Sequence, residues 1–510
     1  MLKKARYILS PRDLAGTPKI YDERRMVEPS RVLRRSGKHY LIAVLSGLLL
    51  ASSFAPLGWY PAPWAALALL FYAVLRSSGP WQAAELGLTA GLVFYTLSLS
   101  WMPNVVSYRA IVFWCVFALW IALHAAIIRG LWEFMEERGL TEEGAILWAA
   151  AAGAAWAGIE YFRSEVWTLA CPWLGLGYSQ TYNPPLFQSL SVWGVYGLSG
   201  FMAAFSAAWA LTPRKRLYLP AAVFSLALVV VISWGGHRLK TLPAENGVPV
   251  KVALVQSESS DIDKLAEMSL TRDAAAADLL VWPEYSFYMP GPEQGPTLRL
   301  LEKKLKASGA LAMLGAGVDE DKKRGIARAN FILVLGRDKK PIGRYDKMYP
   351  VQFVETGLRG GRDPHPVDTP LGKIGPQICY DLAFEDGARI MARQGARLLV
   401  VPTLDPMEWG NLQHTQHSDM SAARSVESGL WLVRAASSGR SQVIDRLGTQ
   451  RAALANGKEG TLTASAYVGP GGTFYTRWGW LFAPACLVFT LAAAVMLLAW
   501  RMPWGKPGLR

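Results

Sequence analysis

The sequence predicts a multi-pass α-helical membrane domain joined to one extracytoplasmic α/β domain. Hydrophobic residues make up 52% of the 510 residues and charged residues only 18%, against about 25% charged in typical soluble proteins. Apolar runs of bilayer-spanning length fill most of residues 40–235 and return near the C-terminus. Between them, residues 240–475 carry charges throughout and alternate short β-like runs with helical stretches, which is typical of one layered α/β domain.

A basic arm precedes the first apolar run. The first 38 residues contain 11 Lys and Arg and four acidic residues, so a net +7 of the total +14 lies there. Binding of nucleic acid also needs an aromatic platform or a groove-reading motif beside the charge, and the arm has neither. We therefore predict that residues 1–39 form a basic cytoplasmic arm and that the protein has no nucleic-acid partner.

Eight apolar runs come close to the ~17–25 residues that cross a bilayer as a helix. Seven form a predicted transmembrane domain over residues 40–235, and the eighth precedes a short tail, 501–510. Basic residues gather in alternate loops, as at Arg76, Arg138 and 214–216, so the positive-inside rule places both termini in the cytoplasm. The domain at 240–475 then lies on the periplasmic side. The runs are 40–57, 62–75, 84–103, 109–132, 144–160, 187–211, 217–234 and 478–500.

Short runs of β-forming residues indicate the strands of the outer domain. Helical patterns separate several of them, as at 300–307 and 386–394. The expected strands are 250–256, 279–282, 311–317, 331–335, 374–380, 398–402, 431–435 and 442–445.

Three stretches of the outer domain carry reactive side chains. The strand at 279–282 is followed by Glu284, and the strand at 374–380 contains Cys379, the only cysteine of this domain. Lys347 is expected in a turn that begins at Arg344. Acyl transfer through a thiol needs a base, a cation for the oxyanion and a thiolate nucleophile. Glu284, Lys347 and Cys379 supply these three chemistries.

The order and flanks of these residues resemble the nitrilase, or carbon–nitrogen hydrolase, superfamily, whose triad is Glu–Lys–Cys. Trp282-Pro283-Glu284 matches the base motif and Ile378-Cys379-Tyr380 the nucleophile motif. The resemblance implies a nitrilase-like αββα sandwich for residues 240–475. Together with the spans, residues 40–500 resemble the bacterial apolipoprotein N-acyltransferases, with supporting stretches at 46–50, 56–58, 172–180 and 194–199.

The same resemblance assigns supporting residues. A second essential Glu stands eight positions after the lysine in this family, and Glu355 stands there. The position two after the nucleophile is commonly Glu and is Asp381 here. Tyr380, Trp409 and Trp173 are candidates for substrate binding.

The resemblance implies transfer of an acyl chain from a membrane phospholipid to the α-amino group of the diacylglyceryl-modified N-terminal Cys of an apolipoprotein. The acyl group would pass through a thioester on Cys379, in the bacterial inner membrane. No cofactor or metal is expected. The alternatives are a membrane-anchored amidase or nitrilase-type hydrolase, a catalytically weakened homologue acting as a binding protein, and a transporter, which few ionisable mid-span residues support.

For some further side chains the sequence allows only less specific interpretations. Cys379 could instead pair with Cys171 in a disulfide. His414 and His417 have the i, i+3 spacing of metal ligands on a helix, but no third ligand accompanies them, so a polar role at the edge of a pocket is favoured. A structural ion network is expected behind the site, formed by Arg424, Glu427 and Arg434.

Overall fold

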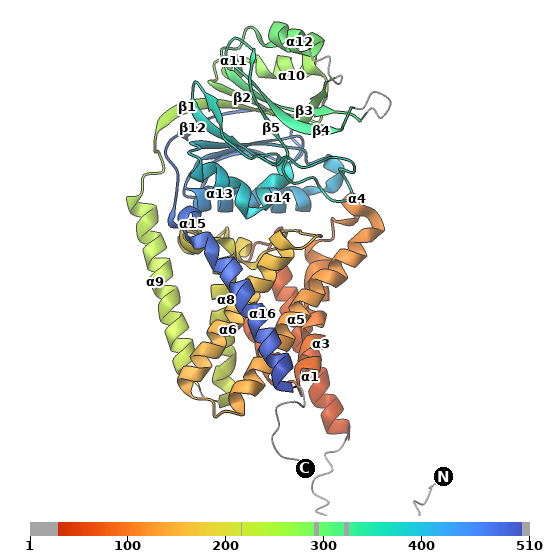
Figure 1. Ribbon diagram of the computed structural model, residues 1–510, viewed down its shortest axis with the longest axis vertical. Helices are drawn as coiled ribbons and strands as arrows, with labels where there is room; N and C mark the ends of the chain where they lie inside the picture. The colour runs from red at the N-terminus through yellow and green to blue at the C-terminus, as the bar shows by residue number, and fades with distance from the viewer. Residues whose placement is uncertain (1–28, 216, 290–294, 321–325, 502–510) are drawn as a thin grey trace, which may run out of the picture.

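The computed structural model describes residues 29–215, 217–289, 295–320 and 326–501. Most of the predicted arm, residues 1–28, and all but the first residue of the predicted tail lie outside the described residues. The last residues of the arm belong to the first helix, which begins at Pro29. Figure 1 shows a helical bundle with an α/β domain at one of its ends.

The bundle contains one helix for each predicted span. In chain order these long helices are α1 (Pro29–Ser52), α2 (Ala62–Leu75), α3 (Pro80–Ser98), α5 (Ala110–Glu136), α6 (Glu142–Tyr161), α8 (Leu190–Lys215), α9 (Leu219–Thr241) and α16 (Phe482–Arg501). Between them lie a short helix α4 (Pro103–Val106) and the loop 167–183, both of which face the α/β domain.

Length and composition identify the helices that can cross a membrane. Among the described residues five helical segments meet both criteria: Pro103–Glu136, Glu142–Val166, Leu190–Pro213, Leu219–Thr241 and Gly479–Arg501. Two shorter apolar helices, Gly37–Ser52 and Ala62–Leu75, accompany them. These helices fit the predicted membrane domain, and the full set of eight spans stays a prediction.

Glycines let neighbouring helices of the bundle approach closely. A Cβ atom on Gly87 of α3 would lie 2.7 Å from the carbonyl oxygen of Ile121 in α5, and one on Gly153 of α6 would lie 2.4 Å from that of Gly200 in α8. Small residues at such contacts are the usual means of packing helices in lipid, where no hydrophobic effect drives them together.

The outer domain is built on two six-stranded sheets. The first has the order β12-β1-β2-β3-β4-β5 and the second β11-β10-β9-β8-β7-β6. The strands are β1 (Val248–Gln256), β2 (Leu279–Tyr288), β3 (Leu311–Val318), β4 (Ala329–Leu335), β5 (Pro341–Asp346), β6 (Val367–Thr369), β7 (Gly372–Pro376), β8 (Leu398–Thr403), β9 (Leu432–Ala436), β10 (Ser441–Ile444), β11 (Gln450–Leu454) and β12 (Gly460–Val468).

Two hydrophobic clusters explain the layering. One joins inward-facing residues of both sheets, such as Val252, Val281 and Val400, so the sheets pack face to face. The other covers the far side of the first sheet with α10 (Ile262–Ser269) and α12 (Gly295–Leu305). Helices α13 (Glu385–Arg393) and α14 (Asn411–Ser428) lie on the second sheet, on the side of the bundle. The predicted αββα sandwich is confirmed.

The structure corrects two local predictions next to the site. Residues Arg344 to Asp346 belong to β5 and not to a turn, and Lys347 comes directly after that strand. The strand expected at 374–380 ends at Pro376, and Cys379 begins a 3₁₀ turn, Cys379–Ala383. The apolar run continues past Pro376 because the residues of the following turn are buried. Buried residues give the same apolar pattern in the sequence whether they form a turn or a strand.

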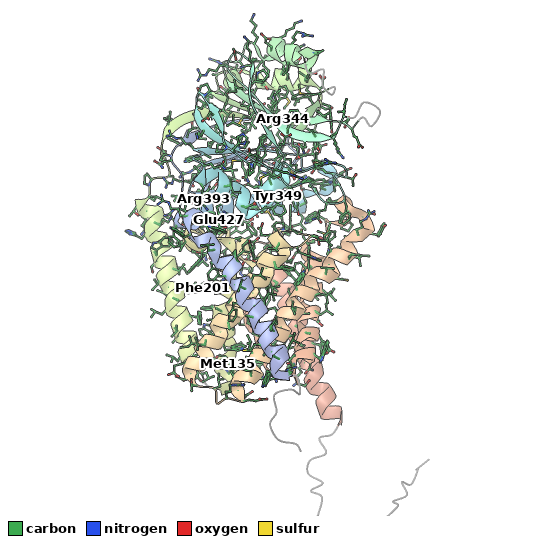
Figure 2. All side chains as sticks on the ribbon, viewed as in Figure 1. Met135, Phe201, Arg344, Tyr349, Arg393 and Glu427 are labelled. Atoms are coloured by element: carbon green, nitrogen blue, oxygen red, sulfur yellow. The ribbon has the colours of Figure 1, made fainter. Side chains whose placement is uncertain are left out.

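Helix α14 joins the outer domain to the bundle. Its Met420, Ala423 and Val426 share a hydrophobic cluster with the membrane helices. Glu427, which Figure 2 places at this junction, accepts a hydrogen bond of 2.8 Å from the backbone N–H of Val195 in α8. The two domains therefore share buried packing and polar contacts at the level of the site.

Candidate active site

Glu284, Lys347 and Glu355 form a buried row of charges between the sheets and the loop after β5. The Lys347 Nζ atom lies 2.8 Å from Glu284 Oε1 and 2.7 Å from Glu355 Oε2. Glu284 stands in β2, and Glu355 lies in the loop that follows Lys347. The side chains of Lys347 and Glu284 are each 1% exposed. The ammonium thus compensates two carboxylates that burial would otherwise destabilise.

Two further side chains, which the sequence analysis missed, bind the same carboxylates. The Asn330 Nδ2 group donates to Glu284 Oε1 at 2.6 Å and to Glu355 Oε1 at 2.8 Å. Tyr285 donates to Glu355 Oε1 at 2.9 Å. Asn330 lies in β4, far from any motif in sequence, so only the pairing of β4 with its neighbours brings it to the site.

Cys379 lies beside this row at the start of its 3₁₀ turn. Its backbone φ of +48° is in the left-handed region, which a non-glycine residue rarely adopts. The Sγ atom is 3.6 Å from the carbonyl oxygen of Leu404, and, besides burial, the charge of Glu284 is close enough to raise the pKa of the thiol. The N–H of Leu404 donates to Glu284 Oε2 at 2.8 Å. Cys379 and Cys171 are both free thiols, so the alternative disulfide is absent.

Burial and the neighbouring charges shift the ionisation of these groups. Burial alone would lower the pKa of Lys347, but Glu284, Cys379 and Glu355 outweigh it and raise that pKa well above its usual value. For Glu355, burial is outweighed by Lys347, and its pKa is lowered. Burial and Glu284 raise the pKa of Cys379 well above its usual value against the opposing charge of Lys347. In this resting state the thiol is protonated beside a carboxylate.

Asp381 fixes the backbone on both sides of the site. Its Oδ2 atom accepts hydrogen bonds from the N–H of Ile378 at 3.0 Å and from the hydroxyl of Tyr345 at 2.9 Å. Its Oδ1 atom accepts from the N–H of Tyr349 at 2.8 Å. Burial is the main cause that raises the pKa of Asp381 to about 7. The Asp381 side chain, which is shorter than the Glu common at this position in the family, therefore connects the turn of Cys379 to the loop after Lys347.

An apolar cavity with about 620 Å³ of empty space, partly open, adjoins Cys379. The predicted substrate-binding residues Tyr380, Trp173 and Trp409 all line it. The membrane domain supplies much of its wall, through Trp101, Met102, Val105, Val106, Phe113, Ala170, Cys171 and Trp173.

Gln416 of α14 fixes two of the aromatic side chains of this wall. Its Oε1 atom accepts from the indole N–H of Trp101 at 2.9 Å and of Trp173 at 3.1 Å. Its Nε2 group donates to the carbonyl oxygen of Ser98 in α3 at 2.9 Å. One residue of the outer domain thus orients the apolar wall that the membrane domain contributes.

A second polar group lies on the other side of Cys379. His417 of α14 is paired with Asp405, which follows β8, and Asp405 is also paired with Arg434 of β9. One polar atom each of Cys379, Asp405 and His417 lie within 4.8 Å of one another. His414 and His417 are both buried. His417 lines the cavity, in agreement with the predicted role at the edge of a pocket, whereas His414 is not among the lining residues.

The ion network expected behind the site is in fact two separate groups. Arg424 pairs with Glu427 and bonds the hydroxyl of Tyr178 at the junction with the bundle. Arg434 pairs instead with Asp405 beside the nucleophile. Sequence spacing could not separate them, because strand β9 brings Arg434 to Asp405 and His417 and not to Glu427.

Comparisons with known proteins agree with this architecture. Residues 46–208 match the model of the apolipoprotein N-acyltransferase N-terminal domain, and residues 251–467 match that of the carbon-nitrogen hydrolase family. An apolipoprotein N-acyltransferase of Geobacter metallireducens is 32% identical over 94% of this chain and 98% of its own length. One of Gloeobacter violaceus is 28% identical over 94% and 97%. The nitrilase-superfamily protein Nit3 of Saccharomyces cerevisiae is 21% identical and covers 44% of this chain and 92% of its own, with a TM-score of 0.38.

The two relatives named apolipoprotein N-acyltransferase match over both domains and nearly their whole length, which confirms the family resemblance. With its apolar helices the chain is a bacterial integral membrane protein. The chain belongs to the apolipoprotein N-acyltransferase family.

Proposed function

We propose that this protein transfers an acyl chain from a membrane phospholipid to the α-amino group of the lipid-modified N-terminal cysteine of an apolipoprotein. The observation that carries the proposal is the position of Cys379. It lies between a buried carboxylate–ammonium row and an apolar cavity whose wall comes largely from the membrane domain. A small-amide hydrolase needs the reactive row but has no use for an apolar cavity whose wall comes largely from the bundle.

In the first half-reaction Glu284 takes the proton of the Cys379 thiol, and the thiolate attacks an ester carbonyl of the phospholipid. An ammonium has three N–H groups, and the one of Lys347 that does not serve Glu284 or Glu355 is available to the tetrahedral oxyanion. The ester C–O bond then breaks, the lyso-phospholipid leaves with the proton held by Glu284, and a thioester remains on Cys379.

In the second half-reaction the neutral α-amine of the apolipoprotein attacks the thioester carbonyl. Glu284 takes one proton from the nitrogen and returns it to the departing Cys379 sulfur, so the amide forms and the thiol is restored. Glu355 holds Lys347 in place throughout, through their contact of 2.7 Å. Tyr380, Trp173 and Trp409 hold the acyl chain against the nucleophile.

The proposal includes an orientation. The outer domain faces the periplasm, and both termini face the cytoplasm of a cell whose inner membrane the bundle spans. Figure 1 supports it, because α1 begins and α16 ends at the end of the bundle remote from the outer domain. Labelling of single cysteines tests this orientation. The cysteines are placed at the exposed residues Lys38 and Arg397, and intact spheroplasts are treated with an impermeant maleimide. Only the second should react.

Incubation of the purified protein with acyl-labelled phospholipid tests the reaction. A hydroxylamine-sensitive labelled adduct should form, Cys379→Ser should abolish it, and Cys171→Ser, which changes another buried thiol of the cavity, should preserve it. Addition of a diacylglyceryl-modified peptide with a free α-amine should discharge the adduct as an amide. Absence of an adduct on folded protein contradicts acyl transfer, and discharge by water alone indicates a hydrolase.

A further inference from the structure

Besides a contact of 3.1 Å between its Nδ1 atom and Arg434 Nη2, His417 makes two hydrogen-bond contacts that the proposed mechanism does not use. Its Nδ1 atom lies 2.9 Å from Asp405 Oδ1, and its Nε2 atom lies 3.3 Å from the backbone carbonyl oxygen of Cys379. The side chain is 1% exposed. The imidazole therefore connects a buried carboxylate to the backbone of the nucleophile.

Asp405 is itself held from three elements. Arg434 of β9 pairs with Oδ2, and Gln413 of α14 donates to Oδ1 at 3.1 Å. The Asp405 N–H donates to the hydroxyl of Ser437 at 3.0 Å. Burial raises the pKa of Asp405, but His417 and Arg434 outweigh it and keep this pKa below its usual value. An ionised, immobile carboxylate is a firm anchor for the imidazole.

The nucleophile needs such an anchor because of its backbone conformation. A left-handed φ at a residue with a side chain persists only where the surroundings enforce it. Asp381 fixes the N–H side of the turn, at Ile378. His417 acts on the other side of the residue, at the carbonyl of Cys379 itself.

The anchor also connects the nucleophile to its base. Leu404, the residue before Asp405, donates its N–H to Glu284 Oε2 at 2.8 Å and places its carbonyl oxygen 3.6 Å from Cys379 Sγ. The end of β8 thus sets the position of the base directly and that of the nucleophile through His417. A shift of about 1 Å between such groups can cost about a hundredfold in rate.

We propose that Asp405 and His417 are positioning residues that hold Cys379 in its reactive geometry through the contact from His417 Nε2 to the Cys379 carbonyl. Neither touches the reacting bond. The inference rests on the proposed function only in taking Cys379 as the nucleophile.

Two substitutions separate the two contacts of the imidazole. His417→Gln can keep a donor near the Nε2 position, towards Cys379, and His417→Asn can keep one near the Nδ1 position, towards Asp405. In both variants Asp405 retains Arg434 and Gln413, so the buried carboxylate stays paired. His414→Gln is the matched control, since His414 is another buried histidine of α14 whose Nε2 contacts the carbonyl of Pro406 at 2.9 Å.

The first measurement is the rate at which iodoacetamide alkylates Cys379 in the full-length, detergent-solubilised protein, followed by peptide mass spectrometry. The second is kcat and KM for acyl transfer. We expect His417→Asn to change the alkylation rate and to lower kcat at least about tenfold, with KM unchanged within about twofold. His417→Gln should stay within about threefold of the wild type, and His414→Gln should leave alkylation unchanged.

Equal effects of the Gln and Asn variants, or no effect of either on alkylation, overturn the proposal. A loss confined to His417→Gln overturns it as well, because the contact to Asp405 alone would then matter. Failure of the proposed function looks different. If the wild type forms no acyl adduct while alkylation still separates the Asn variant from the Gln variant, the positioning role stands and acyl transfer does not.

Discussion

The two walls of the Cys379 cavity differ in origin and in chemistry. The reactive wall consists of Cys379, which lines the cavity, and of Glu284 and Lys347 beside it. All three come from the outer domain and lie within a buried network of charges and hydrogen bonds. The apolar wall comes mainly from α4, α5 and the loop 167–183 of the membrane domain, with Trp101 and Trp173 fixed by Gln416. The proposed function therefore places the chemistry in the outer domain and much of the substrate contact in the membrane domain.

The comparison predicts separate kinetic effects. A change in the reactive wall should lower the rate of the chemical step whatever the acyl donor. A change in the apolar wall should alter the use of long-chain donors and spare reactions of the thiol with small reagents. The four predictions below test this separation in order of decreasing effect.

Removal of the site cation should have the largest effect. Lys347→Met leaves Glu284 and Glu355 as buried carboxylates without the cation that they share. We expect adduct formation to fall about a hundred- to a thousandfold, as with the loss of an oxyanion-stabilising group, and stability to fall by about 3–5 kcal/mol. Single-turnover labelling measures the rate of adduct formation, and thermal unfolding measures the stability.

The control is Lys339→Met, which removes another buried ammonium of the same domain, bonded to the carbonyl of Ala310. It should lower stability and leave the adduct rate unchanged. Adduct formation by Lys347→Met within tenfold of the wild type would contradict the role of the cation.

Asn330 tests whether the reactive wall depends on residues outside the motifs. Asn330→Leu removes the amide that joins Glu284 to Glu355. Loss of buried hydrogen bonds worth about 1–3 kcal/mol corresponds to a fall of about 10- to 100-fold in adduct rate if they position the base. Asn456→Leu, at a half-buried asparagine outside the site, is the control. Equal rates for wild type and Asn330→Leu would restrict the reactive wall to the three motif residues.

Filling the cavity tests the apolar wall. Val105→Trp adds a large ring to the lining. We expect KM for long-chain phospholipid to rise about tenfold, in line with about 1–2 kcal/mol of lost apolar burial, while short-chain donors and alkylation of Cys379 by iodoacetamide are little affected. Ile111→Trp, at an exposed residue of α5, should change neither. A matching fall in alkylation would show that the two walls are not separable.

The smallest effect concerns the dependence of stability on pH. Burial raises the pKa of Asp381 from 3.8 to about 7, so between these values the folded protein binds more protons than the unfolded chain. Its contribution to stability is therefore present below pH 3.8 and is lost as the pH rises through 7. At about 1.4 kcal/mol per pKa unit, the contribution is at most about 4 kcal/mol.

We accordingly expect the unfolding temperature of the wild type to fall between pH 5 and pH 8 by more than that of Asp381→Asn, which does not titrate. Asp368→Asn, at an exposed position of β6, serves as the control. Parallel curves for the wild type and Asp381→Asn would show that Asp381 is ionised in the folded protein throughout this range.

Local sequence was a good guide at the motifs. Glu284 was found because it follows an apolar run, although β2 continues past it to Tyr288, and Lys347 because its order between Glu284 and Cys379 resembles the family triad. The same logic misjudged residues 374–380, because the backbone leaves the sheet at Pro376 while its side chains stay buried. Asn330 and Asp405 gave no signal, since an amide in a strand and an acid after one are common on solvated surfaces.

The sequence by itself determined the division into an apolar bundle and an outer α/β domain, because hydrophobic periodicity is a local property of the chain. The αββα class and the candidate trio came from motifs that resemble a known family. Only the tertiary structure decided that His417 contacts the nucleophile, that Gln416 orients two tryptophans of the other domain, and that Arg434 serves Asp405 rather than Glu427. These contacts join residues from different helices, strands and domains. Their partners are chosen by the packing of whole layers, which no local pattern encodes.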